Sequence, residues 1–229
     1  MIGAMWQVAA ACAIFVGGHF LLSAEPLRST LRTRLGDNGF RGVYSTIAGA
    51  SLAWLGFAYG AAPYVELWPQ THWARSIPTI VMPVALLLAV CGFSQFNPTV
   101  TGQGFRDIAG DPAPGVLKVT RHPVMWGFGL WALAHLPPNG DLASLILFGG
   151  LAGLALGGAR AIDARRQRTD PAGFARIAAV TSNLPLAALL SGRQRLRFAD
   201  LGLLRVLIAA VLYVALFHAH RWIAGVSVV

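Results

Sequence analysis

The sequence contains few charged residues and almost no cysteine. Aspartate, glutamate, lysine and arginine make up 12% of its 229 residues, whereas hydrophobic residues make up 55%. Soluble domains carry about 25% charged residues, so this composition excludes an ordinary soluble domain and indicates a polytopic membrane protein. The two cysteines, Cys12 and Cys91, both lie in apolar stretches and form no spaced framework. We therefore predict neither a disulfide scaffold nor a zinc site.

Acidic residues are scarce, and several familiar motifs are missing. Only nine Asp and Glu residues occur, and none falls inside the apolar stretches described below. Those stretches thus offer no paired carboxylates for acid–base catalysis and no carboxylate ligand for a catalytic zinc. The sequence also has no Walker motif, no HExxH, and no GxGxxG that opens a strand–helix unit. We attribute the net charge of +9 to membrane topology, and we do not expect nucleic acid as a partner.

Six apolar stretches can be counted along the chain. They cover residues 3–22, 42–62, 77–93, 124–136, 142–161 and 201–217. A membrane-spanning helix needs about 20 residues, which the first, second and fifth stretches provide and the third and sixth reach with a few flanking residues. The fourth is too short alone. The sequence therefore predicts an all-α, polytopic membrane helical bundle of about six transmembrane helices, in a single domain covering residues 1–229.

The basic residues predict the orientation of this bundle. All Lys and Arg residues except Arg75 and Arg221 fall in alternate connections between the apolar stretches. Because such residues concentrate on the cytoplasmic side, both termini are predicted to lie outside the cytoplasm.

Two further features concern packing and the membrane surface. Glycines 149, 153 and 157 predict a close helix–helix contact, and the polar, basic residues 163–200 are expected to form an amphipathic or irregular surface segment near anionic lipid.

Three histidines, His19, His122 and His135, lie within or at the edges of apolar stretches. A single histidine there would often bond a backbone carbonyl, but three in one small bundle also suit metal or cofactor ligation. Gly17 and Gly18 would let a flat ring approach His19 closely, and a neutral imidazole is a good axial ligand for haem iron.

Depth in the membrane bears on which histidines could act together. On the predicted topology, His19 and His122 lie on the cytoplasmic side and His135 nearer the outside. Thirteen residues of helix separate His122 from His135 by roughly 20 Å, so depth alone pairs His19 with His122.

Arg121 has two interpretations that stay open. It is a topogenic charge at the membrane surface, or it is a partner for an anion such as a haem propionate or a lipid phosphate.

Several short motifs occur in order along nearly the whole chain. They are Gly18-His19, Arg34-Leu35-Gly36, Asn97-Pro98-Thr99, Thr120-Arg121-His122-Pro123, Trp131 to His135, Asn139-Gly140-Asp141, Ile162-Asp163 and residues 181–185. In these the chain resembles the NnrU family, which is linked to nitrogen-oxide metabolism and includes a haem b enzyme, 15-cis-ζ-carotene isomerase. The resemblance implies a bacterial inner-membrane protein that binds haem b iron through His19 and His135, with His122 and Arg121 as further candidates for cofactor binding.

The resemblance also implies classes of activity. One is a redox-dependent cis–trans isomerase acting on a polyene or another apolar small molecule, and another is a factor in denitrification. Ala132 stands where the isomerase has a cysteine proposed as an alternative ligand. Two alternatives remain: a membrane methyltransferase similar to isoprenylcysteine methyltransferases, which share the Arg121-His122-Pro123 pattern, and a non-catalytic haem sensor or accessory protein. Membrane lipid and haem are the expected partners.

Overall fold

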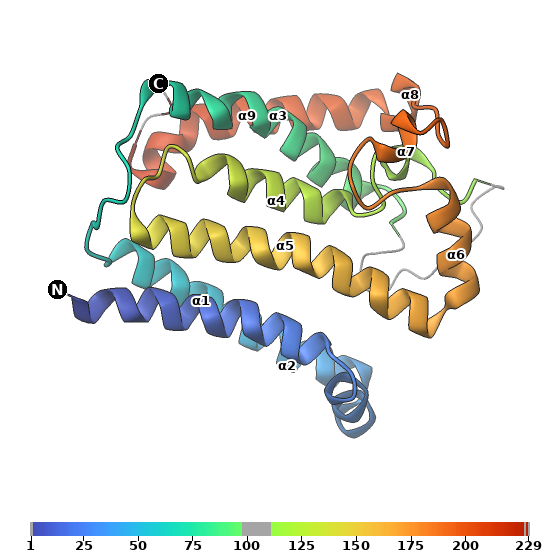
Figure 1. The fold of residues 1–229 in the computed structure, drawn as a ribbon, viewed down its shortest axis with the longest axis horizontal. Coiled ribbons are helices and arrows are strands. Elements are labelled where there is room, and N and C mark those ends of the chain that lie inside the picture. Colours follow the sequence, from blue (N-terminus) through green and yellow to red (C-terminus); the bar gives the residue numbers. More distant parts are fainter. Residues whose placement is uncertain (1, 98–110, 227, 229) are drawn as a thin grey trace. The chain divides into compact units, whose positions relative to one another are not determined.

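The structure is a computed structural model that describes residues 2–97, 111–226 and 228. Pro98, Thr99 and Arg106, which contributed to the sequence analysis, lie outside these residues. The described residues form nine α-helices and one 3₁₀-helix, with an isolated bridge between Glu66 and Asp141 but no β-strand (Figure 1). The predicted all-α class is therefore confirmed.

The helices follow the apolar stretches closely. In chain order they are α1 (Ile2–Ser23), α2 (Leu27–Gly60), α3 (His72–Ser94), η1 (Gly115–Lys118), α4 (Pro123–His135), α5 (Leu142–Thr169), α6 (Pro171–Val180), α7 (Ala187–Leu190), α8 (Phe198–Leu201) and α9 (Leu203–Ala224). Within the described residues, α1 from Met5, α3, α5 and α9 are long and apolar enough to cross a membrane. These four helices support a membrane protein, and the count of six crossings stays a prediction.

Two helices depart from a simple span. In α2, Gly36 adopts φ 70° and ψ 170°, a backbone conformation that glycine tolerates best, and so interrupts the helix before the predicted second stretch. The helix α4 has 13 residues, which corresponds to about 20 Å, whereas the hydrocarbon core of a bilayer is about 30 Å thick. The chain just before α4 is non-helical, which matters for the site described below.

The chain divides into two compact units, and the first comprises Met1–Ala74 and His135–Leu154. Here α1 packs along α2, and both contribute to a core of Val8, Ala11, Cys12, Phe15, Leu55, Ala58 and Ala143. Gly150 permits close contact between α5 and α1, because a Cβ atom there would collide with Sγ of Cys12. The predicted glycine stripe was wrong in this respect: a Cβ at Gly153 meets no atom within 4 Å, and one at Gly149 meets only Leu145 of its own helix.

The second unit comprises Arg75–Ala134 and Ala155–Val229. Its helices α3 and α4 pack closely at two glycines, which have no side chain to keep the helices apart. A Cβ at Gly92 would lie 2.7 Å from Val124, and one at Gly127 would lie 2.8 Å from the carbonyl oxygen of Ala85. This pairing of the end of α3 with the start of α4 shows that the two helices run antiparallel. The helix α9 exposes most of its large apolar side chains, as a lipid-facing helix does.

The stretch 163–200 consists of short helices joined by irregular segments. It buries Ile177, Thr181, Ser182 and Ala188, while many of its other residues are exposed. Arg193 donates through Nη1 to the carbonyl oxygen of Thr181 (2.9 Å) and so caps the end of α6. The middle of this stretch therefore packs one side against the rest of the second unit, and its place near anionic lipid stays a prediction.

Candidate functional site

His19 lies in the last turns of α1, in the first unit. Its Nδ1 is 2.6 Å from the carbonyl oxygen of Phe15, and its ring contacts the rings of Phe15 and Tyr44, with centroids 4.5 and 5.3 Å away. A carbonyl oxygen can only accept a hydrogen bond, so Nδ1 carries the proton and a neutral ring keeps its lone pair on Nε2. No hydrogen bond from the described residues reaches Nε2. His19 is therefore held with Nε2 available to accept a hydrogen bond or to bind a metal.

His135 is the last residue of α4, and it also belongs to the first unit. Its ring stacks on Phe148 with a centroid distance of 5.3 Å, and its carbonyl oxygen accepts a hydrogen bond from Nδ2 of Asn139 (2.7 Å). Cys12 contacts the same stretch of α5, because its Sγ donates to the carbonyl oxygen of Ile146. His19 lies seven residues beyond Cys12, about 10 Å further along α1. The structure thus places the His19 and His135 rings at different levels, on separate aromatic partners.

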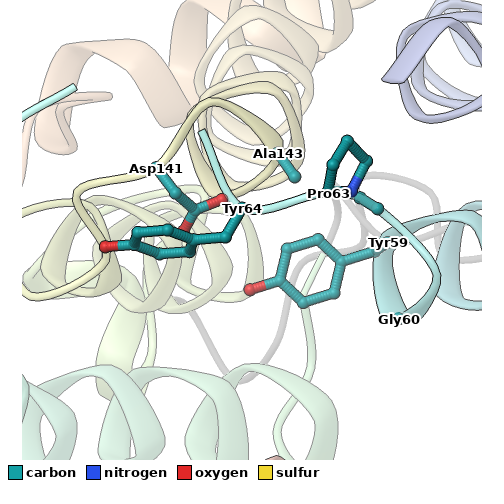
Figure 2. Close-up of a pocket in the computed structure, with 7 residues that line it drawn as sticks. Tyr59, Gly60, Pro63, Tyr64, Asp141 and Ala143 are labelled. Carbon is teal, nitrogen blue, oxygen red and sulfur yellow. The ribbon is translucent and has the colours of Figure 1, made fainter. Parts of the chain in front are cut away.

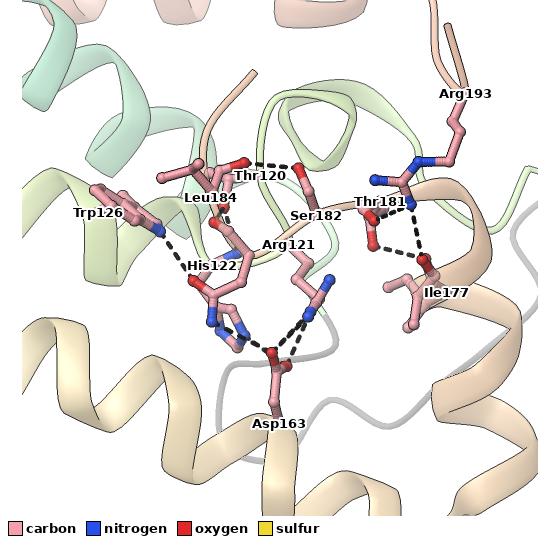
Figure 3. Close-up of polar contacts among 12 residues, drawn as sticks. Thr120, Arg121, His122, Trp126, Asp163, Ile177, Thr181, Ser182, Leu184 and Arg193 are labelled. Atoms are coloured by element: carbon pink, nitrogen blue, oxygen red, sulfur yellow. Dashed lines mark hydrogen bonds and ion pairs between the residues drawn. The ribbon is translucent and has the colours of Figure 1, made fainter. Parts of the chain in front are cut away.

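The second unit brings together Arg121, His122 and Asp163 (Figure 3). Arg121 donates through Nε and Nη2 to the two carboxylate oxygens of Asp163, at distances of 2.6 to 3.0 Å. Nε2 of His122 lies 2.7 Å from Oδ1 of the same carboxylate. The guanidinium also lies over the ring of Phe174, 5.6 Å from its centroid. One carboxylate is therefore shared by a guanidinium and an imidazole, a geometry that gives strong, directional hydrogen bonds.

A non-helical segment positions Arg121 and His122. Residues 119–122 run beside residues 182–186, and the backbone N–H of Arg121 donates to the carbonyl oxygen of Ser182 (3.0 Å). Oγ1 of Thr120 donates to the carbonyl oxygen of Asn183 (2.6 Å). Irregular backbone at membrane depth is tolerated where protein satisfies its polar groups, as happens here. Pro123 then begins α4, a position that suits its missing N–H.

Asn183 extends the cluster to a tryptophan. Its Nδ2 donates to Oδ2 of Asp163 (3.3 Å), and its Oδ1 accepts from Nε1 of Trp126 (3.2 Å). Three motifs that are far apart in sequence, residues 120–123, 162–163 and 181–185, therefore meet in one polar cluster. The asparagine fixes the orientation of the carboxylate independently of Arg121 and His122.

The His122 side chain is fully buried, and its two nitrogens differ. Nε2 faces Asp163, whereas Nδ1 has no hydrogen-bond partner among the described residues. A carboxylate in this position orients an imidazole, as in many metal and catalytic sites. The guanidinium of Arg121 already pairs with a carboxylate of the protein, and its pairing with an external anion stays a prediction.

The sequence analysis did not assign a role to Asp163 or Asn183. It ended the fifth apolar stretch at residue 161, whereas α5 continues to Thr169 and carries Asp163 just beyond that end. The signal was present in the motifs, since Ile162-Asp163 and residues 181–185 were both part of the family resemblance. What the motifs could not show is that both meet Arg121-His122.

The comparisons with known proteins agree with the resemblance. A family model described as NnrU protein matches residues 7–228. No curated protein and no solved structure matches the chain. Because the family match covers almost the entire sequence, including all three polar motifs of the cluster, the chain belongs to the NnrU family.

Proposed function

We propose that this chain is an integral membrane protein that binds haem b, with His19 as an axial ligand through Nε2. The observation that carries the proposal is the 2.6 Å hydrogen bond from Nδ1 of His19 to the carbonyl oxygen of Phe15. Histidines that bind metals almost always donate their other ring N–H to such an acceptor, which fixes the tautomer and the ring orientation. Bound haem would supply redox or Lewis-acid chemistry in an apolar surrounding.

His135 is the proposed second ligand, on the strength of the family resemblance, and His122 is the alternative. The structure favours different roles for these two rings. Nε2 of His122 already faces Asp163, and only Nδ1, the nitrogen next to Cβ, is left. We therefore propose that His122 and Asp163 orient Arg121 and shape the polar end of the second unit, while His19 binds the iron. The His135 ring lies at another level of the first unit, so its pairing with His19 rests on the family resemblance and not on the arrangement of the two rings.

The activity proposed for the haem protein is redox-dependent isomerisation of an apolar polyene, or a role in nitrogen-oxide metabolism. The apolar helices suit a substrate delivered from the membrane. The chain itself would bind and orient such a substrate and exclude water from it. The methyltransferase alternative rests on Arg121-His122-Pro123 alone, and in the structure these residues bind to Asp163 and to the 182–186 segment.

We further propose that the chain crosses the bacterial inner membrane six times, with both termini outside the cytoplasm. The basic residues support this orientation. The short helix α4 fits a crossing because the buried residues that precede it, Val116, Leu117, Thr120 and His122, continue the protein interior beyond the helix. Alkaline phosphatase fused after residue 229 should be active, and a fusion after residue 66 should be active as well, whereas one after residue 36 should be inactive.

Absorption spectra of the detergent-purified protein test the haem proposal. We expect a haem b Soret band that is lost in His19→Ala and kept in His72→Ala, a matched control at the start of α3. Loss of low-spin character in His135→Ala would support the second ligand. A monodisperse protein that remains haem-free after haem is added would contradict the proposal, and binding of S-adenosylmethionine by the same sample would favour the methyltransferase.

A further inference from the structure

A pocket in the first unit is built from the end of α2, the loop after it and the start of α5. Its volume is about 240 Å³, and its lining includes Tyr59, Tyr64, Pro63 and Asp141 (Figure 2). At about 30 Å³ per water molecule, this space corresponds to about eight waters, and it is smaller than the roughly 300 Å³ at which pockets for drug-sized ligands begin. The pocket therefore suits a small ligand or a small chemical group.

Asp141 is the charged group of the pocket. Its side chain is buried, with the residue 8% exposed, and its oxygens accept hydrogen bonds from the backbone N–H of Ser144 (3.0 Å) and from Oγ of Ser144 (2.6 Å). Two carboxylate oxygens offer about four acceptor positions, so these bonds leave acceptor capacity. Within the described part of the chain no Lys, Arg or His forms an ion pair with Asp141, although the protein carries a net charge of +9. Asp141 directly precedes α5 and caps its N-terminus, which stabilises the carboxylate in part. A cationic ligand in the pocket would stabilise this buried negative charge further.

Two tyrosines line the pocket together with Asp141. The hydroxyl of Tyr59 lies 2.9 Å from Oγ of Ser144, which ties its ring to the same hydrogen-bonded group as Asp141. Tyr64 is 62% exposed, and Figure 2 shows its ring beside the Asp141 carboxylate. Aromatic faces attract ammonium groups, most strongly when the cation is partly desolvated. An aspartate with two tyrosines, and no basic side chain in the lining, is suited to an organic cation.

The backbone holds the pocket in shape. The N–H groups of Leu67 and Trp68 both donate to the carbonyl oxygen of Gly140, and the N–H of Leu142 donates to the carbonyl oxygen of Val65. Nε1 of Trp68 donates to the carbonyl oxygen of Pro137 (3.1 Å). These bonds fasten the loop that carries Tyr64 to the segment that carries Asp141, so the aromatic and acidic groups are organised before any ligand arrives.

We propose that this pocket binds an alkylammonium group through Asp141, Tyr59 and Tyr64. The group could belong to a free small cation such as choline or ethanolamine, or to the headgroup of a membrane lipid, since both present the same ammonium chemistry. The proposal is independent of haem, because it uses none of the histidines assigned to the iron.

Calorimetric titration of the full chain in nanodiscs made only of phosphatidylglycerol tests the proposal. Choline or ethanolamine is expected to bind, and 3,3-dimethyl-1-butanol, the uncharged analogue of choline, is expected to bind at least tenfold more weakly. Asp141→Asn keeps acceptor and donor groups for Ser144 but removes the charge, and it should weaken binding at least tenfold. Tyr64→Leu should weaken binding severalfold, whereas Tyr213→Phe, a tyrosine variant in the second unit, should bind as the wild type does.

The outcomes separate the ligand source from the site itself. If choline binds in phosphatidylglycerol nanodiscs but not in phosphatidylcholine nanodiscs, the lipid headgroup is the natural occupant; equal binding in both identifies the free cation. The proposal is overturned if neither cation binds in phosphatidylglycerol, if the uncharged analogue binds equally well, or if a monodisperse Asp141→Asn protein binds choline with wild-type affinity.

Discussion

Removal of the Asp163 carboxylate should destabilise the protein strongly. In Asp163→Ala, Arg121 loses its bidentate partner and His122 loses the hydrogen bond at Nε2. The Arg121 and Asp163 side chains are 13% and 16% exposed, so the guanidinium would be left largely desolvated. Breaking a buried ion pair by removing one partner costs about 3–5 kcal/mol, and the partial exposure of this pair places the expected loss near the lower end, at ~3 kcal/mol.

The chain offers a matched comparison in an exposed pair. Nε and Nη2 of Arg32 donate to both oxygens of Asp37 at 2.7 and 2.9 Å, nearly the same geometry, but these side chains are 44% and 54% exposed. Exposed ion pairs contribute little to stability, so Asp37→Ala should cost far less than Asp163→Ala. The two variants thus compare an exposed carboxylate with a buried one that His122 and Asn183 also bind.

Unfolding in mixed micelles of increasing SDS content, followed by tryptophan fluorescence, would measure these free energies. A double-mutant cycle adds Arg121→Leu and the double variant, and the coupling energy between Arg121 and Asp163 should exceed ~1.5 kcal/mol. The reasoning is refuted if Asp163→Ala costs no more than Asp37→Ala, or if Arg121→Leu and Asp163→Ala add without coupling.

Two further predictions concern other parts of the fold. Gly140→Ala should destabilise the first unit by roughly 2 kcal/mol, because the new Cβ would collide with the carbonyl oxygen of Trp68, whereas Gly149→Ala should be close to neutral in the same SDS titration. The backbone N–H of Arg197 and the ammonium group of Lys118 lower the pKa of Asp200 below 3.8, so the stability from this carboxylate is present above that value and is lost as the pH falls through the lower, folded pKa. Asp200→Asn should therefore flatten the acid limb of a thermal-unfolding profile below about pH 4, and an unchanged limb would contradict this assignment.

The apolar pattern predicted the helices well, because long uncharged stretches allow little else in a membrane. The first, third and sixth stretches became α1, α3 and α9 with shifts of a few residues at the ends. The ends of helices in polar sequence were harder to predict. The extension of α5 through Asp163 to Thr169 depends on partners elsewhere in the chain, since Arg121 and His122 neutralise and bind the carboxylate that this extension carries.

The sequence predicted some residues of the candidate site but not the contacts between them. The histidines were identified because polar groups in apolar stretches are rare, and Arg121 because the fourth stretch is short. The tautomer of His19 depends on a hydrogen bond to its own helix, which composition does not show. The acidic pocket depends on Asp141 meeting Tyr59 and Tyr64 across a long separation in sequence, and no local pattern predicts that meeting.

Chemical rescue of His19→Gly tests the central claim most directly. Removing the imidazole side chain should abolish the low-spin haem b spectrum of the purified protein, and added imidazole should restore it by occupying the vacated position. In His122→Gly, the low-spin haem spectrum should be the same as that of the wild type, both before and after imidazole is added, because Asp163 already holds Nε2 of the His122 ring. Full haem binding with an unchanged spectrum in His19→Gly would contradict the account.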